Sequence, residues 1–147
     1  MRKFEYRFEK VLGYKKHLEK QKQRELAQVR QLEEKQKEKI AEILRQRREN
    51  QDRKKQFLVG NVSTEQLNSY SRYFILNYHL EKQNRTILKK IEEEVEKRRQ
   101  ILVEATKQKK IYEKLREKHW ERYQEEYNRV DQKETDELGQ RMRQSPG

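Results

Sequence analysis

Few side chains in this sequence could perform catalysis, and their spacing matches no catalytic or metal-binding motif. The three histidines are His17, His79 and His119, and there is no cysteine. No histidine has a glutamate three residues before it, which excludes both the Glu-x-x-His motif of di-iron bundles and the histidine pair of zinc proteases. Without cysteine, the chain can form neither a disulfide framework nor a thiolate metal site.

Phosphate-binding and nucleophilic chemistry are excluded in the same way. The four glycines, at positions 13, 60, 139 and 147, are too dispersed for a glycine-rich phosphate loop. A nucleophile, its base and an orienting group also need a pocket, which a pair of long helices does not provide. We therefore expect no catalytic, cofactor-binding or metal-binding residues and predict that the protein is not an enzyme.

The composition favours long helices over a globular domain. Charged residues make up 44% of the chain and apolar residues only 31%, too few for a thick central core. The apolar residues are nevertheless periodic, and the chain has only one proline and four glycines, which argues against disorder. The sequence thus predicts an extended all-α assembly.

A first helix is predicted over about residues 3–56 by apolar residues spaced three and four apart. The same register places polar side chains in the seam, so we expect only modest stability. These polar positions are Lys15, Lys22, Glu25 and Gln36. The stripe consists of Phe4, Phe8, Val11, Leu18, Val29, Leu32 and Ile43, flanked by Leu12, Leu26, Ile40 and Leu44.

A turn is predicted over about residues 57–63, where the pattern breaks. Gly60 and Asn61 can both adopt the left-handed conformation that ends a helix. Ser63 is a candidate N-cap, and Gln66 three residues later completes a capping box.

A second helix is predicted over about residues 64–138, followed by a frayed tail over 139–147. Its stripe keeps one register for more than eight heptads, as a coiled coil does. The stripe runs through Leu67, Tyr70, Phe74, Asn77, Glu81, Asn84, Leu88, Ile91 and Val95, then through Arg98, Leu102, Ala105, Lys109, Tyr112, Arg116, His119, Tyr123 and Val130.

One short turn forces the two helices to run antiparallel. We therefore predict a single domain over residues 1–147, an antiparallel coiled-coil hairpin whose second helix is the longer. Pairing outward from the turn leaves roughly 20 residues of the second helix unpaired, about 30 Å at the helical rise. Aromatic residues gather around this free end, where they can seal the open end of the hairpin.

A second apolar stripe lies beside the first on the second helix. It consists of Tyr73, Leu76, Leu80, Gln83 and Ile87. Two interpretations stay open. Either this stripe faces water and marks a partner site, or it widens the seam by packing against Ile40, Ile43 and Leu44.

The net charge of +12 implies an acidic partner such as nucleic acid, anionic lipid or an acidic protein surface. Basic residues alternate with glutamate instead of clustering, which is typical of a solvated helix face. The N-terminus has no apolar segment of a signal peptide, and the longest uncharged stretches, 56–64 and 73–80, are far shorter than a membrane span. We therefore expect a soluble protein that stays where it is made.

Three segments resemble the flagellar type III export protein J family (FliJ). The opening run Phe4-Glu-Tyr-Arg-Phe-Glu-Lys-Val-Leu12, followed by Gln23-Arg-Glu-Leu-Ala27, is similar to the family's N-terminus. The aromatic segment 70–83 lies where the family has a similar patch. The tail Asp131-Gln-Lys-Glu-Thr-Asp-Glu-Leu138, with Gln140 and Arg141, is similar to its closing motif.

The resemblance implies a non-enzymatic, stalk-like rod of the flagellar protein export apparatus. Its implied partners are the hexameric export ATPase, the cytoplasmic domain of the membrane export gate and the export chaperones that it helps recycle. It implies a cytoplasmic location at the inner face of the cell membrane at the flagellar base, with membrane association only through partners.

The resemblance also assigns residues to these partners. The implied gate-binding residues are Tyr73, Leu76, Leu80, Gln83 and Ile87, and the implied ATPase-binding residues are Phe4, Phe8, Trp120, Tyr123, Tyr127, Asp136 and Leu138. The alternatives are a basic coiled-coil tether and a nucleic-acid-associated structural protein. We expect no nucleic acid partner, because the basic residues lack the clustering of a recognition face.

Overall fold

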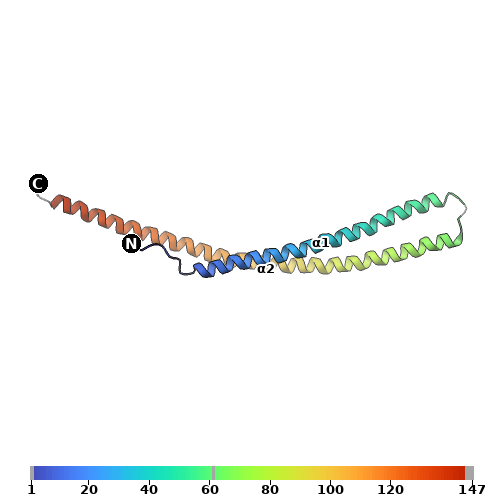
Figure 1. Ribbon diagram of the computed structural model, residues 1–147, viewed down its shortest axis with the longest axis horizontal. Coiled ribbons are helices and arrows are strands. Elements are labelled where there is room, and N and C mark those ends of the chain that lie inside the picture. The colour runs from blue at the N-terminus through green and yellow to red at the C-terminus, as the bar shows by residue number, and fades with distance from the viewer. Residues whose placement is uncertain (1, 61, 145–147) are drawn as a thin grey trace. The chain divides into compact units, whose positions relative to one another are not determined.

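Two long helices account for nearly all of the residues that the structure describes. The computed structural model describes residues 2–60 and 62–144. Helix α1 spans Glu9–Phe57 and helix α2 spans Thr64–Gln144, joined by one short connection (Figure 1). No strand occurs within the described ranges. The helices run antiparallel, so the predicted all-α hairpin with a longer second helix is confirmed.

The chain divides into two compact units, and both contain segments of α1 and α2. The first unit consists of Met1–Gln21 and Val103–Gly147, and the second consists of Lys22–Leu102. Within each unit, a narrow row of side chains between α1 and α2 takes the place of a globular core. The expectation of a single domain over residues 1–147 stays a prediction.

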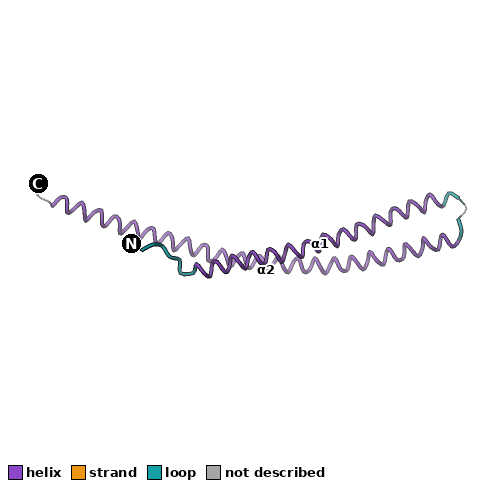
Figure 2. Tube along the Cα trace, in the orientation of Figure 1, coloured by secondary structure: helices purple, strands orange, loops and turns teal. Residues whose placement is uncertain are grey.

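The N-terminal segment differs from its prediction, because α1 begins at Glu9 and not near residue 3. Residues 2–6 form no regular element and residues 7–8 form a turn (Figure 2). The carbonyl of Arg2, which a helix would pair with the N–H of Tyr6, accepts a hydrogen bond from the Tyr123 hydroxyl at 2.7 Å. The Tyr6 hydroxyl in turn donates to the carbonyl of Tyr112 at 2.9 Å. Contacts with α2 therefore replace the first helical turns.

The C-terminal end of α2 also differs, since the helix continues past the predicted end at residue 138 as far as Gln144. A glycine inside a helix costs about 1 kcal/mol relative to alanine, which is too little for Gly139 to stop a long helix. Arg141 and Arg143 in the last turn complement the negative end of the helix dipole. Residues 145–147 of the predicted frayed tail lie outside the described residues.

The start of α2 confirms the predicted capping box. The Gln66 N–H donates to Ser63 Oγ, and the Ser63 N–H donates to Gln66 Oε1, each at 3.2 Å. Gly60 does not adopt the left-handed conformation expected of it. Its N–H donates instead to the carbonyl of Phe57 at 3.5 Å, which ends α1 in a tight turn. Asn61 lies outside the described residues.

The predicted register of α2 matches the observed burial. Buried and half-buried positions follow the expected three–four spacing from Tyr70 to Tyr123, with Asn77 and Ala105 the most enclosed. Leu67, Arg116 and Val130 are the predicted seam residues that are exposed. Val130 lies in the part of α2 that extends past the N-terminal end of α1, so no residue of α1 in the first unit covers it.

The predicted register of α1 is confirmed at most positions, because its expected seam residues are buried or half-buried with the exception of Leu32, which is 55% exposed. Three residues expected on the flanks, Leu12, Leu26 and Ile40, are more enclosed than predicted and are buried. Glu19 is buried as well, so its carboxylate must find a partner across the seam.

Polar side chains bridge the seam of the second unit. Gln36 Nε2 donates to Asn84 Oδ1 at 2.8 Å and to the Asn84 carbonyl at 3.0 Å. Arg47 donates to Asn77 Oδ1 at 2.6 Å and forms an ion pair with Glu81 at 2.5 Å. Because such groups satisfy one another only in the correct alignment, they fix which residues of α1 and α2 face each other.

A charged group occupies the seam of the first unit. Glu19, 8% exposed, forms an ion pair with Lys109 at 3.0 Å. Hydrogen bonding from Thr106, supported by Lys109, lowers the pKa of the Glu19 carboxyl against the opposing effect of burial. The ionised carboxylate is therefore the form that the folded unit favours.

Replacing both members of the Gln36–Asn84 pair with leucine should stabilise the protein, because an apolar pair fills the seam without desolvating amides. We expect the free energy of unfolding to rise by about 1 kcal/mol in the double variant. Asn84→Leu alone should lower it by a similar amount, since the buried Gln36 amide loses an acceptor. Urea denaturation followed by circular dichroism measures the free energy of unfolding of both variants. A double variant that is less stable than Asn84→Leu alone would contradict this expectation.

Acid should destabilise the protein through Glu19. A depressed pKa contributes stability that is present above the unfolded-state pKa and is lost as pH falls through the folded-state value. The melting temperature should therefore fall as pH drops below the ordinary glutamate value of 4.5. Glu19→Gln should flatten this dependence, whereas Glu117→Gln, at an exposed position of α2, should leave it unchanged. Equal slopes in all three proteins would contradict a special role for Glu19.

Candidate partner-binding surfaces

The second apolar stripe of α2 faces water along most of its length. Leu76 is 67% exposed, Leu80 47% and Ile87 46%, and Gln83 is exposed as well. All four belong to the second unit, and steps of three and four place them along one flank of the helix. These four residues therefore face water and do not widen the seam, and their role as a partner site stays a prediction.

Tyr73, the first residue of this stripe, is half-buried and partly belongs to the seam. Its ring contacts that of Phe74 edge-on, with centroids 5.4 Å apart. Its hydroxyl is buried without a hydrogen-bond partner. The exposed part of the stripe therefore begins at Leu76, one turn later than the sequence predicted. We call its residues Leu76, Leu80, Gln83 and Ile87 the gate-stripe.

The first unit brings the predicted aromatic residues together. Phe4 contacts Trp120 at a centroid distance of 5.0 Å and Tyr123 at 5.4 Å. Trp120 stacks on Tyr123 at 5.7 Å, and Tyr127 follows at 6.3 Å. Trp120 and Tyr127 remain 41% and 49% exposed. The cluster therefore seals the N-terminal segment against α2 and leaves aromatic surface available to a partner.

Tyr6 forms the enclosed part of the same cluster. Its ring contacts Phe8 at 5.9 Å and His119 at 5.5 Å. Burial, with smaller contributions from Tyr112 and Glu9, raises the pKa of its hydroxyl. The hydroxyl therefore stays protonated and keeps donating to the Tyr112 carbonyl.

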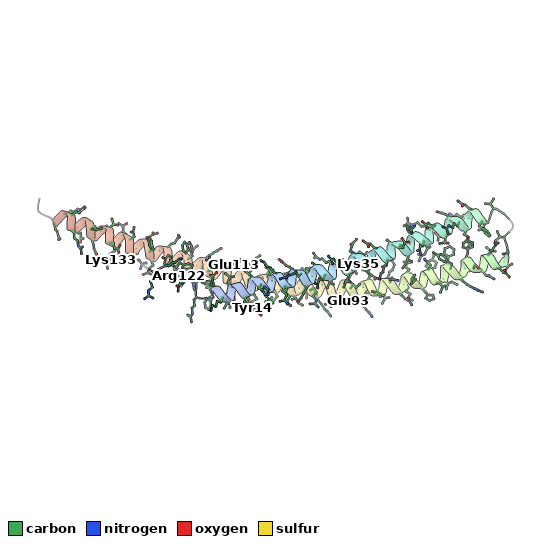
Figure 3. The ribbon with its side chains drawn as sticks, in the orientation of Figure 1. Tyr14, Lys35, Glu93, Glu113, Arg122 and Lys133 are labelled. Carbon is green, nitrogen blue, oxygen red and sulfur yellow. The ribbon has the colours of Figure 1, made fainter. Side chains whose placement is uncertain are left out.

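The other two residues assigned to the ATPase, Asp136 and Leu138, lie apart from this cluster. Every residue from 124 to 144 is exposed, which confirms the predicted unpaired end of α2. We call residues 124–144 the overhang. Figure 3 shows Lys133 on this part of α2, with no second helix beside it. Leu138 is 58% exposed.

The histidines do not form a site in the part of the chain that the structure describes. His17 and His79 are exposed, and His119 packs against Tyr6. Across residues 2–60 and 62–144, no three histidine or carboxylate side chains lie close enough to hold a metal ion. None of the described helices has an apolar stretch long enough to cross a membrane.

The sequence analysis missed a groove on the other flank of α2. Ile75 and Tyr78 line it together with Leu58, and these side chains are 59%, 54% and 49% exposed. The guanidinium of Arg47 lies over the ring of Tyr78 at 4.0 Å, which holds that ring in place. The seven large apolar residues between positions 70 and 80 were the available signal, since one seam and one stripe do not account for all of them.

A family model described as "Flagellar FliJ protein" matches residues 4–146, almost the whole chain. The chain belongs to the FliJ family. The FliJ resemblance in the opening, the aromatic segment and the tail is thereby confirmed. No curated protein and no solved structure gives a significant match.

Membership of the FliJ family makes the protein a component of the flagellar protein export apparatus. FliJ proteins are structural components of that apparatus and are not known enzymes. The exposed apolar side chains described above lie in the gate-stripe, the aromatic cluster, the overhang and the groove.

Proposed function

We propose that this FliJ protein connects the hexameric export ATPase with the cytoplasmic domain of the membrane export gate and helps recycle export chaperones. It acts without catalysis, in the cytoplasm at the flagellar base, and reaches the membrane only through its partners. The family match supports the setting. The single observation that carries the proposal is that apolar surface is exposed on both units, at different positions of α2.

The gate-stripe is the proposed surface for the export gate. Its three aliphatic side chains are exposed on a protein that has few apolar residues to spare. Exposed apolar surface of this kind marks a protein–protein interface, and its central side chains contribute most of the binding energy. Tyr73, which the family resemblance assigns to the same surface, is half-buried in the seam next to the gate-stripe.

The aromatic cluster and the overhang are the proposed surfaces for the ATPase. Trp120, Tyr127 and Leu138 offer exposed apolar side chains, and aromatic residues are enriched in the centres of interfaces. Phe4 and Tyr123 contact these exposed rings, and Phe8 packs against Tyr6 and Tyr112 in the enclosed part of the cluster. Asp136 adds negative charge to the overhang.

Truncating the gate-stripe should weaken binding to the cytoplasmic domain of the export gate. We expect Leu76→Ala with Leu80→Ala to raise the Kd at least about tenfold, since each leucine contributes roughly 1–2 kcal/mol when an interface buries it. Leu32→Ala with Ile101→Ala is the matched control, because both residues are exposed and lie outside the stripe. Calorimetry measures the Kd, and equal values for both double variants would contradict the assignment.

The protein should stimulate the export ATPase of the same organism at about one copy per hexamer. Tyr127→Ala with Leu138→Ala should reduce this stimulation, because the change removes exposed apolar surface from the overhang and leaves the seam intact. Phosphate release measured across a salt series tests both expectations. Full stimulation by the overhang variant would exclude this surface, and no stimulation by the unaltered protein would remove the ATPase from the proposal.

A further inference from the structure

The groove lies on the flank of α2 opposite the gate-stripe and within the second unit. It encloses about 840 Å³ between α1 and α2, and Leu58, Phe74, Ile75 and Tyr78 form its apolar lining. Ile75 and the gate-stripe residue Leu80 are five positions apart, which separates them by well over a quarter turn around the helix. The groove is therefore a different surface from the one proposed for the gate.

Positive charge surrounds this apolar lining. Arg48, Lys54 and Lys55 line the groove, against a single carboxylate from Asp52. The ammonium of Lys54 lies 5.6 Å from the centre of the Phe74 ring. A partner that fits this groove must therefore place apolar side chains against the lining and carboxylates against the surrounding lysine and arginine side chains.

The overhang has this combination. Residues 124–144 carry six acidic and four basic side chains, which gives −2 in a chain whose net charge is +12, and all six acidic side chains lie within residues 124–138. Spacings of three and four place Tyr127, Val130, Glu134 and Leu138 on one face of the helix. Arg129 falls on the opposite face, since two residues correspond to about 200° of rotation.

The same face of the overhang is exposed in the described part of the chain. Tyr127, Val130 and Leu138 are 49%, 36% and 58% exposed, and Glu134 is exposed between them. A helix that is apolar on one face and polar elsewhere is stable only when that face is covered. Its charge is opposite to that of the groove.

We propose that the overhang of one molecule docks in the groove of a second copy of this chain. The lining extends from Arg48 in α1 to Leu58, the first residue after α1, about 15 Å at the helical rise, and Tyr127 to Leu138 covers about 17 Å. Apolar side chains of the overhang meet the lining while Glu134 faces Lys54 or Lys55. An amphipathic helix in a groove is a common mode of recognition.

The contact joins two different surfaces, so its symmetry is constrained. Two copies either exchange overhangs in a closed pair or add head to tail into longer chains. Either form covers Tyr127 and Leu138, the overhang residues proposed for the ATPase. Self-association and ATPase binding then compete for the same helix.

Charge reversal on each side tests this proposal with the full chain. Lys55→Glu changes the groove and Glu134→Lys changes the overhang, and both residues are exposed, so neither change disturbs the seam. Lys107→Glu, exposed on α2 away from the groove, is the control for net charge. Sedimentation equilibrium across the micromolar range measures the mass of each protein and of the equimolar mixture of the two variants.

The unaltered protein should exceed its monomer mass of 18.4 kDa as concentration rises, and salt should reverse this. Each reversal alone should raise the apparent Kd at least about tenfold, while the control should not. The mixture should associate again, because the overhang of the Glu134→Lys variant carries a lysine that can pair with the glutamate in the groove of the Lys55→Glu variant. A monomeric unaltered protein would overturn the proposal and leave the groove to a foreign acidic helix. Association that neither reversal weakens would also overturn it, by moving the contact to another surface.

Discussion

Two helices have only one seam, and this constraint governs the rest of the structure. Every side chain between α1 and α2 must be held by its partner across the seam, because the described residues form no third layer that could enclose it. Aliphatic residues such as Leu12 and Ile43 use this space for packing. Polar residues use it for pairing, as Gln36 does with Asn84 and Glu19 does with Lys109. These polar pairs fix how α1 aligns with α2, and they make the seam less stable than an entirely apolar one.

The same constraint explains why apolar surface remains exposed. The segment of α2 from residue 70 to 80 carries more large apolar side chains than a single seam can cover. The seam takes Tyr70, Phe74 and part of Tyr73, and the remainder divides between the gate-stripe on one flank and the groove on the other. A thicker domain would bury these residues, whereas here they are left for other proteins.

The sequence predicted the hairpin, the seam of α2 and its unpaired end, and it did not reveal the groove. The register of α2 was predictable because Leu88, Ile91, Val95 and Leu102 repeat without ambiguity. In α1 the most enclosed residues were harder to predict, because apolar residues occupy adjacent positions, as at Val11 and Leu12, so two alignments fit equally well. The groove was missed because its lining comes from the flanks of both helices: α1 supplies the positive charge, and α2 supplies most of the apolar side chains.

The clasp between the N-terminal segment and α2 also bears on the order in which the chain folds. Close to the turn, α1 and α2 meet after short loops, so pairing can begin there at small entropic expense. The hydrogen bond between Arg2 and Tyr123 joins residues 121 positions apart, close to the longest separation that the chain allows. Such a contact forms late and opens early, since most of the chain must be ordered before it is favourable. The aromatic end is thus the natural starting point for unzipping of the hairpin.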